Sequence, residues 1–355
     1  MKEAPQLNNS WKHRIVLAYS GGVQSSAAIG WLRDTFAADV VTITLDLGQG
    51  TELTSVRERA LAAGAIRAHV IEARDEFARG YVAPSLQAGA LYEDCLPLSQ
   101  ALAQALLAKR LVDLAGMEAA VAVAFVPHAV PAGTRSRLTV AVQALAPGLR
   151  LIEVPPATAM SNGHAVDVNL WGRTIELKGA PGEPLYTLTR AVRDCPDEPA
   201  FIDIEFEAGL PVRANAIEMP MLELIESLEI IAGAHGVGRI AGRGCASSIV
   251  EEAPAAVVLH AALRHLETTT LPAEFRRVEI DLARTYADLI FHGNWHSPSR
   301  EALDAYVQGF HPRLTGTVRV ELFKGSCQIV EAGHRSSPSA HCDADSRPLV
   351  QGIVS

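Results

Sequence analysis

The chain has 355 residues, of which 48% are hydrophobic and 20% charged, as expected for a folded globular protein rather than a disordered one. Its formal net charge of -9 argues against nucleic acid as a partner, since duplex-binding surfaces usually carry a basic excess. No apolar run approaches the roughly 18 residues of a membrane span, and the first residues lack the apolar core of a signal peptide. We therefore expect a cytoplasmic protein with neither nucleic acid nor membrane as a partner.

Strand and helix patterns alternate along the first part of the chain. Continuous apolar runs, typical of strands buried on both faces, occur at residues 14–20, 39–48, 67–73, 119–126 and 149–156. Helical spacing separates several of them, at residues 25–36, 52–65 and 97–118. This alternation predicts an α/β fold with a parallel sheet, helices on both of its faces, and ligands at the carboxyl ends of its strands.

The pattern changes after about residue 155. Strand patterns at residues 165–177, 200–218 and 316–333 predict antiparallel pairing, and helical patterns occur at residues 220–236, 253–271 and 274–295. We therefore expect a nucleotide-binding domain over residues 1–155 and an α+β domain over residues 156–332. Residues 333–355 are polar and rich in serine, and we expect a flexible tail there.

The stretch "AYSGGVQSS" (Ala18 to Ser26) joins the first predicted strand to the first predicted helix. Its small residues let backbone N–H groups approach an anion closely, and the helix N-terminus with its serine hydroxyls favours phosphate. The loop contains no lysine, so it differs from the lysine-bearing phosphate loop of kinases. The whole string favours phosphate binding, with an unliganded turn capped by serine as the alternative.

This loop resembles the pyrophosphate loop of the N-type ATP pyrophosphatases, usually Ser-Gly-Gly-x-Asp-Ser/Thr-Ser. Further blocks resemble one branch of that superfamily, the argininosuccinate synthase family, at residues 45–50, 90–115, 166–176, 232–240, 291–298 and 320–326. The resemblance spans about residues 13–332 and implies an N-terminal domain like the adenine nucleotide alpha hydrolases. It further implies ATP and Mg²⁺, a reaction that joins citrulline to aspartate with release of AMP and pyrophosphate, and a homo-oligomer, either a dimer or a tetramer.

The resemblance also implies which residues contact ATP: Ala18, Tyr19, Ser20, Gly21, Gly22, Gln24, Ser25, Ser26 and Leu45. Gln24 stands where the family's loop carries an aspartate. A neutral amide cannot match a carboxylate as a ligand of Mg²⁺, although backbone binding of ATP need not be lost. We therefore predict no metal-ligating side chain in this chain.

By the same resemblance, five residues fall at the substrate site: Tyr92, Thr134, Arg137, Thr174 and Glu176. Tyr92 and Arg137 keep contacts that the family makes to citrulline, but Thr134 replaces an aspartate. The family's tyrosine over citrulline has no clear counterpart, since Glu251, which falls near its place, is a carboxylate. Each lost charged contact costs about 1.5–3 kcal/mol, so several losses together would abolish specificity for citrulline and aspartate.

Three hypotheses remain open. The first is a repurposed ligase that adenylates another small amino or ureido acid, in a specialised biosynthetic branch of amino-acid metabolism. The second is a non-catalytic relative that serves as a partner subunit or regulator. The third is an argininosuccinate synthase with an unfamiliar site.

Overall fold

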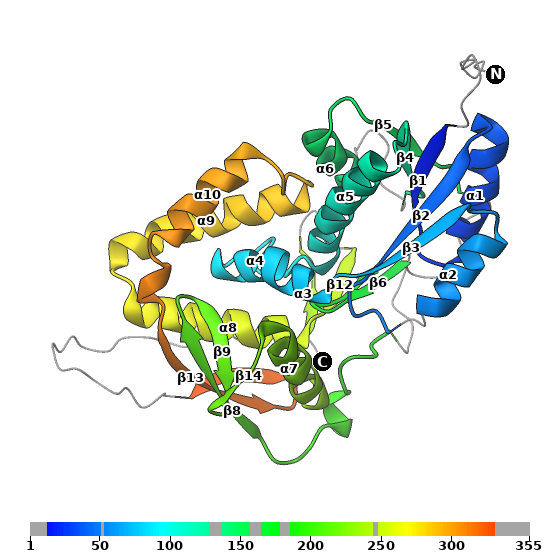
Figure 1. Cartoon of the computed structure of the whole chain (residues 1–355). Coiled ribbons are helices and arrows are strands. Elements are labelled where there is room, and N and C mark those ends of the chain that lie inside the picture. Colours follow the sequence, from blue (N-terminus) through cyan, green and yellow to red (C-terminus); the bar gives the residue numbers. More distant parts are fainter. Residues whose placement is uncertain are drawn as a thin grey trace.

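The computed structural model describes residues 13–50, 53–127, 136–156, 165–177, 185–243 and 248–330. Within them the chain forms one parallel sheet of five strands and two antiparallel sheets of five and four strands (Figure 1). The parallel sheet is formed by residues 14–153 and both antiparallel sheets by residues 165–330, and these two parts are called the N-terminal and C-terminal halves below. This arrangement confirms the predicted α/β fold class. None of the described helices is long and apolar enough to cross a membrane.

The parallel sheet has the strand order β3-β2-β1-β4-β5. Its strands are β1 (Arg14–Ala18), β2 (Asp39–Asp46), β3 (Arg67–Glu72), β4 (Ala122–Phe125) and β5 (Arg150–Glu153). Alternate residues of the central strand β1 serve two cores, because successive side chains of a strand point to opposite faces. Ile15 and Leu17 belong to a core with residues of the first two helices, and Val16 belongs to the larger core that contains α5.

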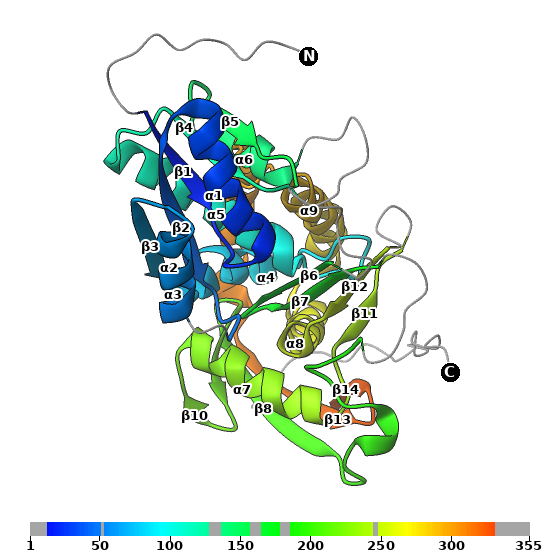
Figure 2. The same ribbon diagram turned by 90° about the vertical axis from the view of Figure 1, so that its right-hand side faces the viewer.

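Helices cover both faces of this sheet. The helices α1 (Val23–Phe36) and α2 (Leu53–Ala62) lie together on one face, which is turned towards the viewer in Figure 2. The other face packs against α5 (Ser99–Met117), whose residues are buried along most of its length. Such burial explains why the sequence of α5 is apolar on more than one side.

The C-terminal half contains the two antiparallel sheets. One has the order β11-β12-β7-β6 and consists of β6 (Ala165–Asn169), β7 (Gly172–Glu176), β11 (Arg239–Ala241) and β12 (Ile249–Glu252). The other has the order β10-β9-β8-β13-β14 and consists of β8 (Ala200–Glu207), β9 (Leu210–Ala214), β10 (Ile217–Glu218), β13 (Gly316–Phe323) and β14 (Ser326–Val330). The long helices of this half are α7 (Met221–Ala234), α8 (Pro254–Thr270) and α9 (Ala273–Phe291).

Several short elements have no counterpart among the predicted ones. They are α3 (Arg74–Phe77), the π-helical turn η1 (Ala78–Val82), α4 (Ala83–Gln87), α6 (Arg137–Leu145), the 3-10 turns η2 (Val192–Asp194) and η4 (His311–Arg313), β11, β12 and α10 (Pro298–Gln308). Most are too short to show a full apolar period. The expected loose tail, residues 333–355, lies outside the described residues.

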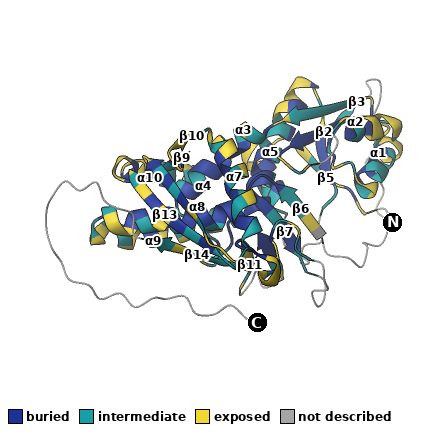
Figure 3. Cartoon of the chain, turned by 90° about the horizontal axis from the view of Figure 1, so that it is seen from below, coloured by how far each residue is buried: buried dark blue, intermediate teal, exposed yellow. Residues whose placement is uncertain are grey.

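The two halves share one continuous core. Figure 3 shows the buried residues, in dark blue, extending from α5 through α4 to α8. The β6–β7 hairpin is tied to the first half, since Leu170 N–H donates to the Leu47 carbonyl (2.6 Å) and the Trp171 indole donates to the Pro97 carbonyl (3.1 Å). These bonds bring the hairpin beside the carboxyl ends of the parallel strands.

Candidate active site

The loop between β1 and α1 has the geometry of an anion cradle. Gly21 has a φ of +79°, a left-handed conformation that favours glycine, and Gly22 is the N-cap of α1. The first N–H groups of a helix have no acceptor within it, and Gly22 makes no side-chain cap. A Cβ built on Gly22 would meet only the Ser20 hydroxyl, at 3.5 Å, so open space faces the helix N-terminus.

Hydroxyl groups surround this cradle. The Tyr19 hydroxyl lies 2.8 Å from Ser26 Oγ, and Ser20 Oγ lies 3.2 Å from Ser25 Oγ. The guanidinium Nε of Arg59, from α2, donates to the Gly21 carbonyl at 3.2 Å and adds a positive charge beside the loop. Hydroxyls, backbone N–H groups and a cation together fit a polyphosphate, so the residues present suit the triphosphate of ATP.

The end of β2 offers no free metal ligand beside the loop. Leu45 is buried, and its carbonyl accepts a hydrogen bond from Gln49 Nε2 (2.6 Å). The Asp46 carboxylate accepts from Gly48 N–H (3.0 Å) and lies 3.5 Å from Arg74 Nε. Among the described residues, no group of three or more His, Cys, Asp or Glu side chains could hold a metal ion.

A second group of polar side chains surrounds Arg137, the first residue of α6. Its Nε donates to the Phe291 carbonyl (2.6 Å), its Nη1 donates to Gln100 Oε1 (3.1 Å), and the guanidinium lies 4.5 Å from the centre of the Phe291 ring. Burial lowers the pKa of Arg137, while the charges of Glu176 and Glu251 oppose that shift. The side chain therefore stays a fixed cation in a partly desolvated place.

Tyr92 packs on the same aromatic ring. The rings of Tyr92 and Phe291 are stacked, with centroids 3.7 Å apart and planes 5° from parallel. The chain turns tightly around Tyr92, whose N–H donates to the Leu96 carbonyl at 2.9 Å. Phe291, at the end of α9, thus contacts two of the predicted substrate residues, Tyr92 and Arg137.

Glu251 also belongs to this group, although the sequence analysis, which placed it near the family's tyrosine, did not count it among the substrate residues. It lies on β12 directly opposite Thr174 of β7, and it is only 2% exposed. The Thr174 hydroxyl donates to Glu251 Oε1 (3.0 Å) and the Ser99 hydroxyl donates to Oε2 (3.4 Å). Burial raises the pKa of Glu251 to about 7, although these hydroxyls and the Arg137 charge act in the opposite direction.

The neighbouring carboxylate, Glu252, has a different environment. It accepts backbone N–H groups of Thr187 (3.0 Å) and Thr189 (3.0 Å) and pairs with Arg173 at 2.9 Å. This network holds the following segment against the sheet and leaves Glu252 fully engaged. Glu251, on the opposite face of β12, is the carboxylate that lies with Arg137.

The structure brings four of the five predicted substrate residues together, namely Tyr92, Arg137, Thr174 and Glu176. Glu176 follows Thr174 by two residues on β7, so both side chains point to the same face of the sheet. The first turn of α5 connects the two charged centres, because Ser99 bonds to Glu251 and Gln100 bonds to Arg137. Thr134 lies outside the described residues.

Comparison with known proteins gives the chain its family. Residues 14–168 match the model of the "Arginosuccinate synthase N-terminal HUP domain", and residues 164–346 match that of the "Arginosuccinate synthase C-terminal domain". The chain belongs to the argininosuccinate synthase family. This family consists of ATP-dependent carbon–nitrogen ligases that act on small molecules.

Individual members of the argininosuccinate synthase family align along nearly the whole chain. Argininosuccinate synthase of Symbiobacterium thermophilum is 40% identical over 362 residues, which cover 92% of this chain and 88% of the relative. The enzyme of Bacillus cereus is 39% identical over 363 residues, with coverage of 93% and 89%. That of Dehalococcoides mccartyi is 38% identical over 350 residues, with coverage of 89% and 86%. The predicted family is thus confirmed.

Proposed function

We propose that this protein is an ATP-dependent, AMP- and pyrophosphate-forming carbon–nitrogen ligase whose substrates differ from citrulline and aspartate. The observation that carries the proposal is the buried carboxyl of Glu251, held by Thr174 and Ser99 within the electrostatic reach of Arg137. A phenol is expected near that place in the argininosuccinate synthase family. A carboxyl with a pKa of about 7 offers a substrate a charge that a phenol does not.

The proposed reaction has two steps. An oxygen of the first substrate attacks the α-phosphorus of ATP, and the bond to the pyrophosphate leaving group breaks. The nitrogen of an amine then attacks the activated carbon, the bond to AMP breaks, and the nitrogen loses a proton. Arg137 would hold a carboxylate of the first substrate, while Glu251, Thr174 and Glu176 would accept its hydrogen-bond donors.

ATP would bind at the loop Ala18–Ser26, with Leu45 beside the adenine. The described side chains around the loop are hydroxyls, one amide and one guanidinium, and they offer no carboxylate cage. We therefore propose that Mg²⁺ arrives with ATP and is held by phosphate oxygens and water, as Mg²⁺ commonly is. Its chemical contribution would be to neutralise charge as pyrophosphate leaves.

The direct test is a product assay. The purified chain is incubated with ATP, Mg²⁺ and pools of amino and ureido acids, and AMP and pyrophosphate are measured. Release of AMP with a substrate other than the citrulline–aspartate pair is expected. AMP formation that requires that pair would overturn the altered specificity. Absence of ATP binding by calorimetry would instead favour the alternative, a non-catalytic relative acting as a subunit or regulator.

A matched pair of glycine variants tests the loop itself. Gly22 has φ -81° and ψ 169°, which other residues adopt freely, and its Cβ position faces open space. Gly22→Val should therefore fold normally but fill the cradle, and ATP affinity should fall by about a hundredfold or more. Gly30→Val, in the middle of the same helix with no atom within 4 Å of the Cβ position, is the control and should leave affinity unchanged.

We also propose a homo-oligomer, either dimer or tetramer, and a cytoplasmic location, as the family resemblance and composition imply. Light scattering on the eluted peak of a size-exclusion column would determine the number of copies, and a monomer at micromolar concentration would contradict the proposed homo-oligomer.

The domain boundary near residue 155 stays a prediction.

A further inference from the structure

Two helices of the C-terminal half line a second cavity, whose lining includes neither the phosphate loop nor Arg137. The helices α8 and α9 meet at the short turn of Leu271 and Pro272 and diverge from there (Figure 1). Residues 89–94 supply a further wall, and the volume is about 460 Å³. That volume lies within the range of small-molecule pockets, which is roughly 300–1,000 Å³.

The lining of this cavity contains polar atoms that lack partners. His260, Glu267 and Glu279 line it, and each is less than a tenth exposed. Among the described residues, Nε2 of His260 and Oε1 of Glu267 have no hydrogen-bond partner. Buried polar atoms are normally paired. Since Glu279 lies within hydrogen-bonding reach of Glu267, Nε2 of His260 is the atom whose missing bond points most directly to a ligand.

Glu267 and Glu279 form a carboxyl pair. Their side chains are within hydrogen-bonding reach of each other, and burial raises the pKa of both. Two such carboxyls do not both ionise easily, so a proton shared between them is favoured and the pair carries less than its full charge. A group that donates several hydrogen bonds and carries positive charge, such as an ammonium, complements this pair.

The same cavity is also lined by arginines: Arg264, Arg276, Arg277 and Arg284. Arg284 is paired with Asp94 at 3.2 Å. The other three make no ion pair with a carboxylate of the described residues, and the buried Nε of Arg276 has no partner among them. Arg264 and Arg276 act electrostatically on the carboxyl pair, whereas Arg277 makes no ion pair within the described part of the chain. Four guanidinium groups thus face three carboxyls, two of which share a proton readily, and this excess favours a ligand that also carries a carboxylate.

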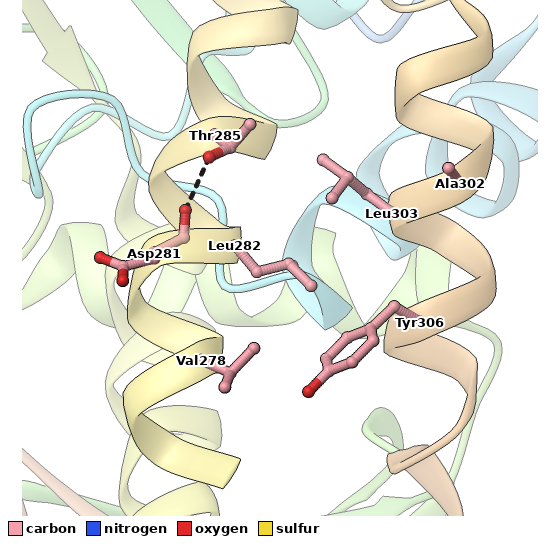
Figure 4. Close-up of a pocket in the computed structure, with 7 residues that line it drawn as sticks. All are labelled: Val278, Asp281, Leu282, Thr285, Ala302, Leu303 and Tyr306. Atoms are coloured by element: carbon pink, nitrogen blue, oxygen red, sulfur yellow. Dashed lines mark hydrogen bonds between the residues drawn. The ribbon is translucent and has the colours of Figure 1, made fainter. Parts of the chain in front are cut away.

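The charged and polar lining of this cavity lies on the face of α9 that is turned towards α8. On the opposite face, α9 and α10 form a shallow groove lined mainly by apolar side chains, among them Val278, Leu282 and Tyr306 (Figure 4). The Thr285 hydroxyl is satisfied within the helix, since it donates to the Asp281 carbonyl at 2.8 Å. Partnerless buried polar atoms therefore mark the cavity between α8 and α9 and not the whole helix.

We propose that this cavity binds a free α-amino acid, with its ammonium group on Glu267 and Glu279 and its carboxylate on Arg264 and Arg276. The side chain of the amino acid would lie along Leu263 and Ile280, which also line the space. A metal ion does not fit, since no described cluster that includes His260 and the two glutamates could hold one. The site goes beyond the proposed reaction and does not depend on it.

Thermal shifts of the full chain, measured with each standard α-amino acid at millimolar concentration and without ATP, test the proposal. At least one amino acid should raise the Tm. The matching amine without the carboxylate, and the matching acid without the ammonium, should raise it less. Calorimetry should then show that Arg264→Glu, a change at an exposed residue, weakens the binding of that amino acid by about ten- to hundredfold.

Two further variants separate this cavity from the substrate site. Glu267→Gln keeps the shape of a protonated carboxyl, so the chain should fold and the affinity for the amino acid should fall. Glu251→Gln, which changes the substrate site, should leave the affinity unchanged. The proposal is overturned if no amino acid raises the Tm, if binding survives Arg264→Glu, or if it is lost in Glu251→Gln. It is also overturned if Arg264→Glu dissociates an oligomer, because a second copy would then cover the cavity.

Discussion

The candidate phosphate loop and the candidate substrate site differ in how the sequence encodes them. The loop is contiguous, from Ala18 to Ser26, and its conformation depends on two glycines and on hydroxyls a few residues apart. The substrate site is assembled from α5, α6, α9, β7 and β12, so Arg137 meets Phe291 across 154 positions of sequence. A local site tolerates change elsewhere in the chain, whereas a site built from distant segments changes whenever one of them does. Under the proposed function, this difference would let the nucleotide site persist while the substrate site changes.

A substitution in the β6–β7 hairpin, which carries Thr174, should cause the largest loss of thermal stability. Gly172 has a φ of +140°, and a Cβ there would lie 2.6 Å from the Glu252 carbonyl oxygen. Gly172→Ala should therefore cost about 4 kcal/mol or more, through backbone strain and a clash, and lower the Tm by many degrees. Gly22→Ala in the phosphate loop is the matched control and should leave the Tm nearly unchanged. If both variants lowered the Tm equally, the hairpin and the phosphate loop would not differ in their tolerance of substitution.

Removal of the central cation should have the next largest effect. Arg137→Gln breaks the bonds to the Phe291 carbonyl and Gln100, and it leaves Glu251 without a nearby positive charge. We expect a loss of about 3–5 kcal/mol in the free energy of unfolding, measured in urea, because the Phe291 carbonyl and the buried Gln100 amide oxygen then lose their donor. Arg193→Gln, which changes an exposed side chain, should lose less than about 0.5 kcal/mol.

Glu251 should make stability depend on pH in a definite direction. Its folded pKa is raised from 4.5 to about 7, so the contribution of Glu251 is most favourable below pH 4.5 and is lost as the pH rises to about 7. The free energy of unfolding of wild type minus that of Glu251→Gln should thus fall over this interval, by about 3 kcal/mol at most, and stay constant above it. The subtraction removes the effects of the other titrating groups. A difference that rises with pH would show that Glu251 is ionised and stabilised by its partners.

The smallest effect is expected in the loop. Gln24→Asp should tighten binding of Mg²⁺-ATP by about tenfold, since a carboxylate is a better ligand for Mg²⁺ than an amide. Binding of ATP in the presence of a chelator should not improve, because the added negative charge then repels the phosphates. Calorimetry with Mg²⁺ and with a chelator measures the two ATP affinities. If Gln24→Asp changed both affinities equally, a phosphate site with this geometry would be contradicted.

Sequence reasoning succeeded where the signal is local. The buried strands, the long helices and the loop conformation follow from short windows, and the family match follows from ordered blocks. The role of Glu251 could not be found in this way, because β12 is four residues long and its partner β7 lies about 75 positions earlier. One signal was present: two adjacent glutamates stand between the apolar pair Ile249–Val250 and the apolar helix α8, and such carboxylates are buried only when they have partners. The segment α3–η1–α4 escaped prediction because its turns are short and contain a π-helical turn.

The first turn of α5 has a consequence for how this substrate site can evolve. Its adjacent residues Ser99 and Gln100 serve opposite charges, Glu251 and Arg137, so neither charged residue can be exchanged without leaving a hydroxyl or an amide unpaired. Substitutions at these four positions should therefore be strongly non-additive, and their order should matter. An evolutionary path that changes this site would pass through poorly folded single variants unless paired changes occur together. The helix turn is thus expected to act as an epistatic constraint on any change of these four residues.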